Sequence, residues 1–297
     1  MRKFRYLSLN DKIFYIIVNT ILTILFVLVL YPCIYVLSAS FSSGSAVQAG
    51  KVLLFPVDIT LEGYLTVFDT ASVWIGFRNS VFYTIVCTLI NVSMTLTTAY
   101  CLSRKDVVGR NFIMLLFTFT MFFSGGIIPS YMLIRSLGML NTVWSILIPT
   151  AIGAYYLIIA RTFIQNSIPE ELLEASMMDG CSDLMYYIKI VLPLSKAIIA
   201  VLVLYYGVTN WNDYFNPMIY LNDRNLYPLT IYLREILLAS QIDPATIDDP
   251  ELQMRMAEMA AIIKYALIVV SMIPVMLIYP FVQKHFVQGV MIGSVKG

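Results

Sequence analysis

Long apolar segments recur along this chain and restrict its fold more than any other feature. Six candidate segments lie at 13–38, 77–102, 111–135, 142–166, 194–221 and 259–282. A helix needs about 20 mostly apolar residues to cross the hydrocarbon core of a bilayer, and backbone groups inside the bilayer must be satisfied within the chain. The pattern therefore predicts an all-α polytopic membrane protein with about six spans.

Composition excludes the other broad classes. Hydrophobic residues make up 59% of the 297 residues and charged residues 12%, about half the charged share of an ordinary soluble domain. The net charge of +1 leaves no basic face for phosphates, so no nucleic acid is expected as a partner. Membrane lipid is the expected surrounding.

The third segment is interrupted by Ser124, Gly125, Gly126 and Pro129. Such breaks persist in a membrane where neighbouring helices or a cavity satisfy the freed backbone groups. We therefore expect this segment to be a broken helix.

Orientation follows from the positive charges. With both termini in the cytoplasm, the inner segments hold twice as many Lys and Arg residues as the outer ones, as the positive-inside rule requires. This orientation predicts a cytoplasmic N-terminal segment, 1–12, ahead of a membrane domain, 13–297. The apolar run after the basic start is too long for a signal peptide, so we expect it to be retained as a helix. Two long loops remain, 167–193 inside and 222–256 outside, and long ordered loops usually carry function.

The inner loop predicts a short, separately capped helix of about three turns. Ser167 and Glu170 have capping-box spacing, Pro169 suits a first turn, and Gly180 suits the left-handed position that ends a helix. An apolar stripe follows helical spacing at Leu172, Ala175 and Met178. Such a helix fits a groove on a partner protein; the alternative is an interfacial helix resting on lipid headgroups.

The same loop carries a spaced motif. Glu174-Ala175-Ser176 is followed by three residues and Gly180, then by nine residues and Ile190-Val191-Leu192-Pro193. This arrangement resembles the EAA motif of ABC-importer permeases, with Ser176 in place of the third alanine and Cys181 in place of a common alanine. Asp179, before the glycine, is also similar to the family pattern.

Other segments extend the resemblance along most of the chain. The stretch from Trp211 to Pro217 resembles the W-N-[DE]-x-x-x-P stretch of carbohydrate-uptake permeases, and Tyr227-Pro228-Leu229-Thr230 is similar to the PLT that follows it. The stretches 125–131 and 137–142 and the tail 283–297 resemble the LplC/YtcP subgroup of the MalG-like family. That subgroup is associated with oligosaccharides, including complex and uronate-containing ones.

The resemblance implies a type I ABC importer transmembrane subunit in a bacterial cell membrane. Its implied partners are a homologous second permease subunit, two cytosolic ABC ATPase subunits, an extracytoplasmic solute-binding protein and an oligosaccharide. The chain has no G-x-x-x-x-G-K-[ST] phosphate loop, so we expect it to bind no cofactor, with ATP and Mg on the partner ATPase. The implied ATPase-coupling residues are Glu170, Glu174, Ala175, Ser176, Asp179, Gly180, Ile190, Leu192 and Pro193. For Asp179, bracing the turn is the alternative.

The fifth span combines polar and aromatic residues at Asn210, Trp211, Asn212, Asp213 and Asn216. Polar groups inside a bilayer are costly unless they face partners or a cavity. We interpret these residues as lining the substrate path, since amides and carboxylates pair with sugar hydroxyls and aromatic rings pack against sugar C–H faces. The alternative is an aromatic belt with helix–helix hydrogen bonds.

The outer loop is rich in acids and turn residues. In the MalG-like subunits that the chain resembles, the corresponding loop reaches the binding protein. The resemblance therefore implies contact residues at Asp243, Pro244, Asp248 and Asp249. An ordinary solvated loop is the alternative.

A membrane enzyme has no catalytic constellation here. His285 is the only histidine, and Cys33, Cys87, Cys101 and Cys181 form no CxxC pair, so we expect neither a catalytic nor a metal site. Two rival functions stay open. One is an ion-coupled secondary sugar carrier using Asp213; the other is an ABC permease for a non-sugar solute.

Overall fold

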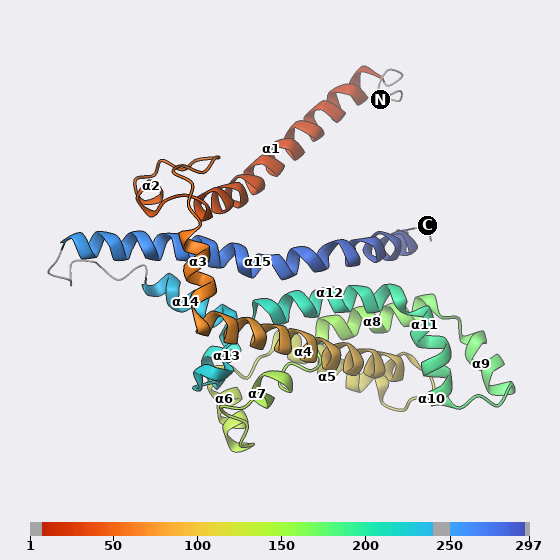
Figure 1. Cartoon of the computed structure of the whole chain (residues 1–297). Helices are drawn as coiled ribbons and strands as arrows, with labels where there is room; N and C mark the ends of the chain where they lie inside the picture. The colour runs from red at the N-terminus through yellow and green to blue at the C-terminus, as the bar shows by residue number, and fades with distance from the viewer. Residues whose placement is uncertain (1–7, 240–249, 295–297) are drawn as a thin grey trace. The chain divides into compact units, whose positions relative to one another are not determined.

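The computed structural model describes the backbone of residues 8–239 and 250–294 and the side chains of 8–238 and 254–277. Within these ranges the chain is helical and contains no strand. The α-helices (Figure 1) are α1 (Leu9–Ser40), α2 (Gly44–Gln48), α3 (Glu62–Asp69), α4 (Ala71–Ser103), α5 (Arg110–Phe122), α6 (Ile127–Ser136), α7 (Trp144–Leu147), α8 (Ala154–Ser167), α9 (Glu170–Met178), α10 (Asp183–Tyr186), α11 (Leu192–Leu194), α12 (Lys196–Asn212), α13 (Phe215–Tyr220), α14 (Leu229–Ala239) and α15 (Pro250–Ser294). A π-helical turn, Tyr187–Val191, joins α10 to α11, and a 3₁₀ turn, Arg224–Leu226, precedes α14.

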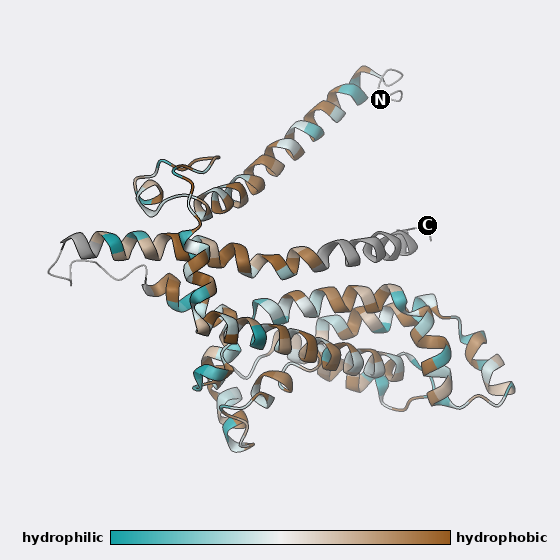
Figure 2. Cartoon of the chain, in the orientation of Figure 1, coloured by the Kyte–Doolittle hydropathy of each residue, from teal (hydrophilic) through white to brown (hydrophobic). Residues whose placement is uncertain are grey.

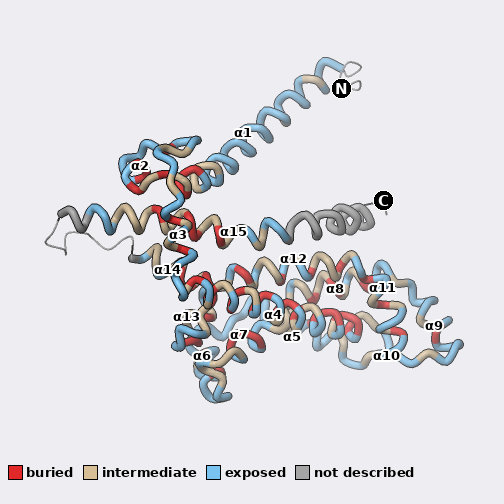
Figure 3. Tube along the Cα trace, in the orientation of Figure 1, coloured by how far each residue is buried: buried red, intermediate tan, exposed pale blue. Residues whose placement is uncertain are grey.

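The chain divides into two compact units. The first comprises 1–70 and 233–271, and the second comprises 71–232 and 272–297. In the first unit, the Ser8 hydroxyl caps α1 by accepting from the Asp11 N–H at 3.2 Å. The apolar residues of α1 are exposed along most of its length (Figures 2 and 3), as expected of a helix surrounded by lipid or by a partner. Only its last turn is buried, beside Ala46, Val47 and Val52.

The second unit is built around α4. Helices α8 and α12 pack against it, and Leu96, Ala99, Leu157, Ala160 and Leu202 form the centre of the resulting core. The short helices lie at the two ends of this unit: α9 and α10 at one end, and α6, α7 and α13 at the other (Figure 1). A second cluster, including Tyr83, Ile146 and Leu221, fills the α13 end.

Among the described residues, three helices are long and apolar enough to cross a membrane: Leu9–Ser40, Ala71–Ser103 and Met254–Leu277. Counting each bent helix pair as one span raises this number to five. The expected break in the third segment is present, because α5 and α6 meet at 119° across a linker that includes Gly126 at φ +89°. The total of six spans and the cytoplasmic position of the termini stay predictions.

The segment 142–166 is not one continuous helix. It consists of α7, an irregular stretch and α8, which is 14 residues long and at about 1.5 Å per residue is shorter than a bilayer core. Pro149, which lacks a backbone donor, and Gly153, which precedes α8, lie in the irregular stretch. The Gly153 N–H donates instead to the Tyr206 hydroxyl at 3.0 Å.

Candidate functional site

Helix α9 forms where the inner loop was expected to fold, although its start differs from the expectation. Ser167 is still the last residue of α8, because the following Ile168 N–H bonds to the Ile164 carbonyl at 3.1 Å. Pro169 is the N-cap of α9 and makes no side-chain capping bond, so the predicted capping box is wrong. Glu170 and Glu171 occupy the first turn, where the helix dipole favours negative charge.

The end of α9 is a Schellman motif around Gly180. The Asp179 N–H bonds to the Ala175 carbonyl, and Gly180 has φ +74° and donates to Met177 at 3.1 Å. The Cys181 N–H donates to the Ser176 carbonyl at 2.9 Å. Gly180 thus ends the helix, as the sequence predicts, because glycine has no Cβ to disfavour the left-handed backbone.

The two faces of α9 differ. Leu173 packs against the core of the second unit and Ser176 is 6% exposed. Leu172, Glu174 and Ala175 are exposed, as is Met178 at 89%. The predicted apolar stripe, with the Glu174 carboxylate beside it, therefore points away from the described part of the chain.

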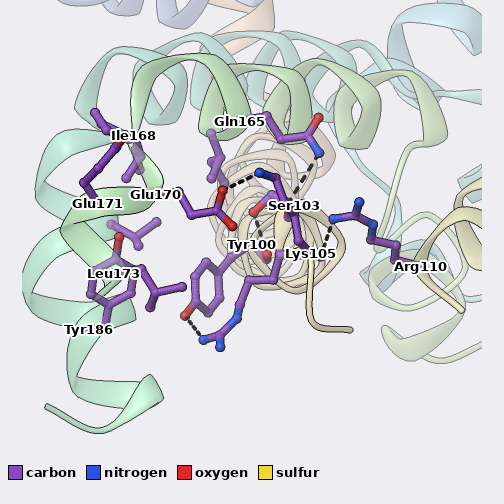
Figure 4. A pocket seen from close by; sticks show the side chains of 14 residues that line it. Tyr100, Ser103, Lys105, Arg110, Gln165, Ile168, Glu170, Glu171, Leu173 and Tyr186 are labelled. Atoms are coloured by element: carbon purple, nitrogen blue, oxygen red, sulfur yellow. Dashed lines mark hydrogen bonds and ion pairs between the residues drawn. The ribbon is translucent and has the colours of Figure 1, made fainter. Parts of the chain in front are cut away.

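A charged cluster holds α9 and α10 against the loop that follows α4. Lys105 forms an ion pair with Glu170 of α9 (Figure 4), and Arg104 forms one with Asp183 of α10. Arg104 is the more buried of the two cations; it also contacts Asp106 at 2.6 Å and the Tyr100 hydroxyl at 3.0 Å. The Arg104 guanidinium lowers the pKa of Asp106 through this hydrogen bond. We call Arg104, Lys105, Glu170 and Asp183 the charged clamp.

Near the clamp, side chains donate to the last two carbonyls of α4 and to the carbonyl of Arg104, which follows it. Arg161 of α8 donates to Leu102 at 2.9 Å, Gln165 to Ser103 at 3.4 Å, and Arg110 of α5 to Arg104 at 2.7 Å. Two of these three donors are cationic, and the negative end of a helix dipole favours cations. A pocket of ≈ 370 Å³ lies among these groups and the first turn of α9. The clamp thus rests on a cross-linked end of the bundle.

The motif residues after Gly180 lie in the return segment to α12. Ile190 is in the π-helical turn and Leu192 begins α11, and both pack against the core. Pro193 is exposed in the first turn of α11, where its missing N–H is tolerated. The segment from Asp183 to Leu194 meets α12 at 78°, so these residues anchor the bend between the inner loop and α12.

In the fifth segment, Asn210 and Trp211 have partners within the chain. The Asn210 amide donates to the side chains of Thr88 at 3.2 Å and Asn91 at 3.0 Å, both on α4. Asn91 is fully buried and in turn donates to the Thr150 carbonyl at 2.6 Å. The Trp211 ring is buried and lies edge-on to Phe77.

Asp213 and Asn216 lie together at the start of α13. One Asp213 carboxylate oxygen accepts from the backbone N–H groups of Phe215 and Asn216, and the other accepts from the Asn216 amide at 2.7 Å. These three bonds hold the Asp213 carboxylate within the turn that begins α13. Asn212, by contrast, is exposed, and its only hydrogen bond to the described residues runs from its amide to Val208 of its own helix at 2.8 Å.

At the same end of the unit, Asn141 holds the chain after α13. Its side-chain oxygen accepts from the Asn222 and Asp223 N–H groups at 2.9 and 2.8 Å, and its own N–H donates to Tyr220. Asp243, Pro244, Asp248 and Asp249, the predicted binding-protein contacts, lie outside the described residues.

Sequence reasoning missed two groups of residues. Arg104 and Lys105 were used only to assign orientation, and their acidic partners are distant in sequence. The polar row Thr88, Asn91 and Thr95 on α4 did leave a signal, namely helical spacing inside an apolar segment. Among the described residues no group of His, Cys, Asp and Glu is arranged to hold a metal ion.

A helical bundle with broken spans, internal polar bonds and a separately capped helix at one end has the architecture of a polytopic transport protein. The chain belongs to the family described as the binding-protein-dependent transport system inner membrane component, whose model matches residues 70–292. It is therefore an ABC transporter permease of the inner membrane, with the type I importer fold.

Individual relatives agree with this assignment. The chain is 40% identical to the polygalacturonan/rhamnogalacturonan transport system permease protein YtcP of Bacillus subtilis, over 97% of this chain and 100% of that protein. It is also 40% identical to the protein LplC of Bacillus subtilis, over 90% and 89% of the two chains. A crystal structure of a bacterial ABC transporter involved in the import of the acidic polysaccharide alginate matches with a TM-score of 0.84 and 34% identity, covering 95% of this chain and 99% of that one.

Proposed function

We propose that this permease is one transmembrane subunit of an ATP-driven oligosaccharide importer and that α9 is the helix through which an ATPase drives it. The supporting observation is the exposed face of α9, Leu172, Ala175 and Met178 with Glu174 beside it. An exposed apolar stripe on a helix fits a groove on a partner protein. Glu170 anchors the helix within the chain through the charged clamp, which leaves Glu174 to meet a basic residue of the partner.

The remaining components are proposed from the family. Two cytosolic ABC ATPase subunits would bind ATP and Mg, because this sequence has no phosphate-binding loop of the Walker type. A homologous second permease would complete the path. An extracytoplasmic binding protein would deliver the oligosaccharide, with Asp243, Pro244, Asp248 and Asp249 as contacts.

Acidic oligosaccharides are the proposed cargo. The permease YtcP is named for polygalacturonan and rhamnogalacturonan, and the matching crystal structure for import of alginate. All three names denote polymers that contain uronate sugars. We place the path along the fifth segment, at Asn210, Trp211, Asn212, Asp213 and Asn216.

Uptake by the whole importer in proteoliposomes tests this function. With the binding protein outside and ATP inside, we expect uptake of trigalacturonate or an alginate trisaccharide that needs ATP and persists when a protonophore collapses the proton gradient. Maltotriose and a dipeptide serve as cargo controls. Uptake that follows the proton gradient without ATP would establish the secondary carrier instead, and uptake of the dipeptide alone would establish a non-sugar permease.

A further inference from the structure

The segment that returns from the inner loop to α12 is irregular in its backbone. The π-helical turn Tyr187–Val191 is followed by α11, which has three residues, and then by a bend of 78° into α12. Figure 1 shows α10 and α11 turned away from the axis of α12. π-Helical turns are rare and frequently lie at functional sites. The hydrogen bonds that this segment makes and leaves unmade therefore bear on its function.

The π-helical turn contains more backbone acceptors than donors. The Leu192 N–H bonds to the Tyr187 carbonyl, five residues back, and the Ser195 N–H bonds to the Val191 carbonyl at 2.9 Å. Three carbonyls lie between these two acceptors, namely those of Ile188, Lys189 and Ile190. Between the two donors lie only Pro193, which has no N–H, and one further residue. In α-helical pairing, four residues back, the Leu192 N–H would instead bond to one of the three carbonyls.

Ser195 lies at the bend and carries an unpaired hydroxyl. The residue is fully buried, and its hydroxyl has no hydrogen-bond partner among the described residues. A helical serine commonly donates to a carbonyl one turn back. Here the backbone N–H of Ser195 already contacts two such carbonyls, Val191 at 2.9 Å and Leu192 at 3.1 Å. Because a buried hydroxyl without a partner is unfavourable, the bent form leaves a bond that a second form can make.

The first turn of α12 offers further bonds of the same kind. Ser195 makes no side-chain capping bond to this helix, and the first N–H groups of any helix have no partner inside it. The preceding carbonyls belong to α11, on the other side of the bend. A wider bend angle would align α11 with α12, so that these N–H groups bond to α11. The Leu192 carbonyl would then be available to the Ser195 hydroxyl.

We propose that the segment 187–195 is a hinge with a bent and a straighter form, and that Ser195 is the positioning residue that stabilises the straighter form. This inference rests on the coupling function proposed for α9. In the straighter form the π-helical turn re-pairs as α-helix and the Ser195 hydroxyl donates to the Leu192 carbonyl. A change of one residue in helical pairing corresponds to about 1.5 Å along the axis and about 100° around it. The hinge therefore transmits a displacement of α9 to α12.

Two buried serines provide a matched test in the reconstituted importer. Ser145 is 1% exposed, and its hydroxyl donates to the Thr142 carbonyl at 2.8 Å, whereas the Ser195 hydroxyl is unpaired in the bent form. With trigalacturonate as the probe, Ser195→Ala should lower uptake per complex about fivefold, as expected for one hydrogen bond lost from the straighter form only. Its thermal midpoint without nucleotide should stay at the wild-type value. Ser145→Ala should lower the thermal midpoint by a few degrees and leave uptake per complex within twofold.

Distances between spin labels report the hinge without relying on uptake. In an otherwise cysteine-free chain, labels replace Leu184 of α10 and Val203 of α12, which are both exposed. A straight helix would separate these positions by about 28 Å along its axis, and the bend shortens that distance. Double electron–electron resonance should detect two distances, with proportions that differ between nucleotide-free and ATP-bound importer. Ser195→Ala should lower the population of the longer distance about fivefold, in line with its effect on uptake.

A control pair and the uptake assay keep the outcomes separate. Labels at positions 94 and 203, on α4 and α12, should give one distance in both nucleotide states, because hydrogen bonds join these helices. A single 184–203 distance in both states of an importer that transports would overturn the hinge. Unaltered populations in Ser195→Ala, or a fall in its thermal midpoint equal to that of Ser145→Ala, would overturn the role of Ser195. Absence of ATP-dependent uptake by the wild type would instead overturn the proposed function.

Discussion

The charged clamp at α9 and the polar contacts between α4 and α12 both join segments distant in sequence, but by different physical means. The clamp uses ions, and the pair that holds α9 lies on exposed side chains: Lys105 and Glu170 are 71% and 47% exposed. The α4–α12 contacts use neutral groups that are largely buried, including the fully buried Asn91 and Thr95. Exposed ion pairs are worth about 0–1 kcal/mol, whereas an unpaired buried polar group costs about 1–3 kcal/mol.

This difference indicates which helices can move relative to one another. The weak, hydrated Lys105–Glu170 pair allows α9 to shift relative to α4 when a partner moves it. The hydrogen bonds between neutral side chains of α4 and α12 resist separation of these helices, so the two helices are expected to move together. Breaking each region should therefore give a different phenotype: altered coupling at the clamp end and loss of assembly in the span.

The largest effect is expected at the end of α9. Gly180→Leu places a side chain at φ +74°, a strain of about 1–2 kcal/mol, and should lower uptake about tenfold by displacing the Schellman turn. A Cβ at Gly180 meets no atom within 4 Å in the described chain, so crowding within the subunit does not contribute. Gly180→Asn is the matched control, since asparagine tolerates this backbone and should retain most uptake. Equal losses in the two variants would show that the backbone conformation is not the cause.

Asn91→Leu should have the next largest effect, and on stability rather than on transport. It removes the Asn91 bond to the Thr150 carbonyl and leaves the Asn210 amide with Thr88 as its only acceptor among the described residues, so complex yield should fall severalfold and the thermal midpoint by several degrees. Uptake per surviving complex should remain within twofold of wild type. Met94→Leu, an exposed change on the same helix, is the control. Reduced transport per complex at normal yield would place Asn91 in the path itself.

The smallest effect is expected in the charged clamp. Lys105→Glu or Glu170→Lys alone should lower the ATPase stimulation by loaded binding protein two- to fivefold, a loss that corresponds to up to about 1 kcal/mol. The double exchange restores an ion pair and should recover most of the stimulation. High salt should reduce the difference between the wild type and the single variants, because exposed charges are screened. Additive losses in the double variant would show that Lys105 and Glu170 do not act through a direct ion pair.

The sequence was sufficient for the features that depend on local chemistry. Apolar runs indicated a helical membrane protein, the Ser-Gly-Gly break separated α5 from α6, and Gly180 ended α9 because left-handed backbone favours glycine. The capping box failed because Ser167 is held in α8 by bonds formed further back in the chain. Local spacing alone could not show that α8 continues that far.

The tertiary partners could not be derived in this way. Lys105 and Glu170 are 65 residues apart, and Asn91 and Asn210 are 119 apart. The sequence showed that the fifth segment contains polar residues, but the spacing of those residues did not indicate which of them face α4. For that reason Asn210 was grouped with Asn212 although their environments differ.

Photo-crosslinking from α9 in the assembled importer tests the central claim most directly. A photoreactive benzoylphenylalanine at position 172 or 178, on the exposed face, should form an adduct with the ATPase subunit. The same group at position 108, a 94% exposed residue of the α4–α5 loop, should form little or none. The account predicts ATPase adducts at 172 and 178 that change in amount when ATP is added. Adducts with lipid alone at both positions would contradict it and would identify α9 as an interfacial helix.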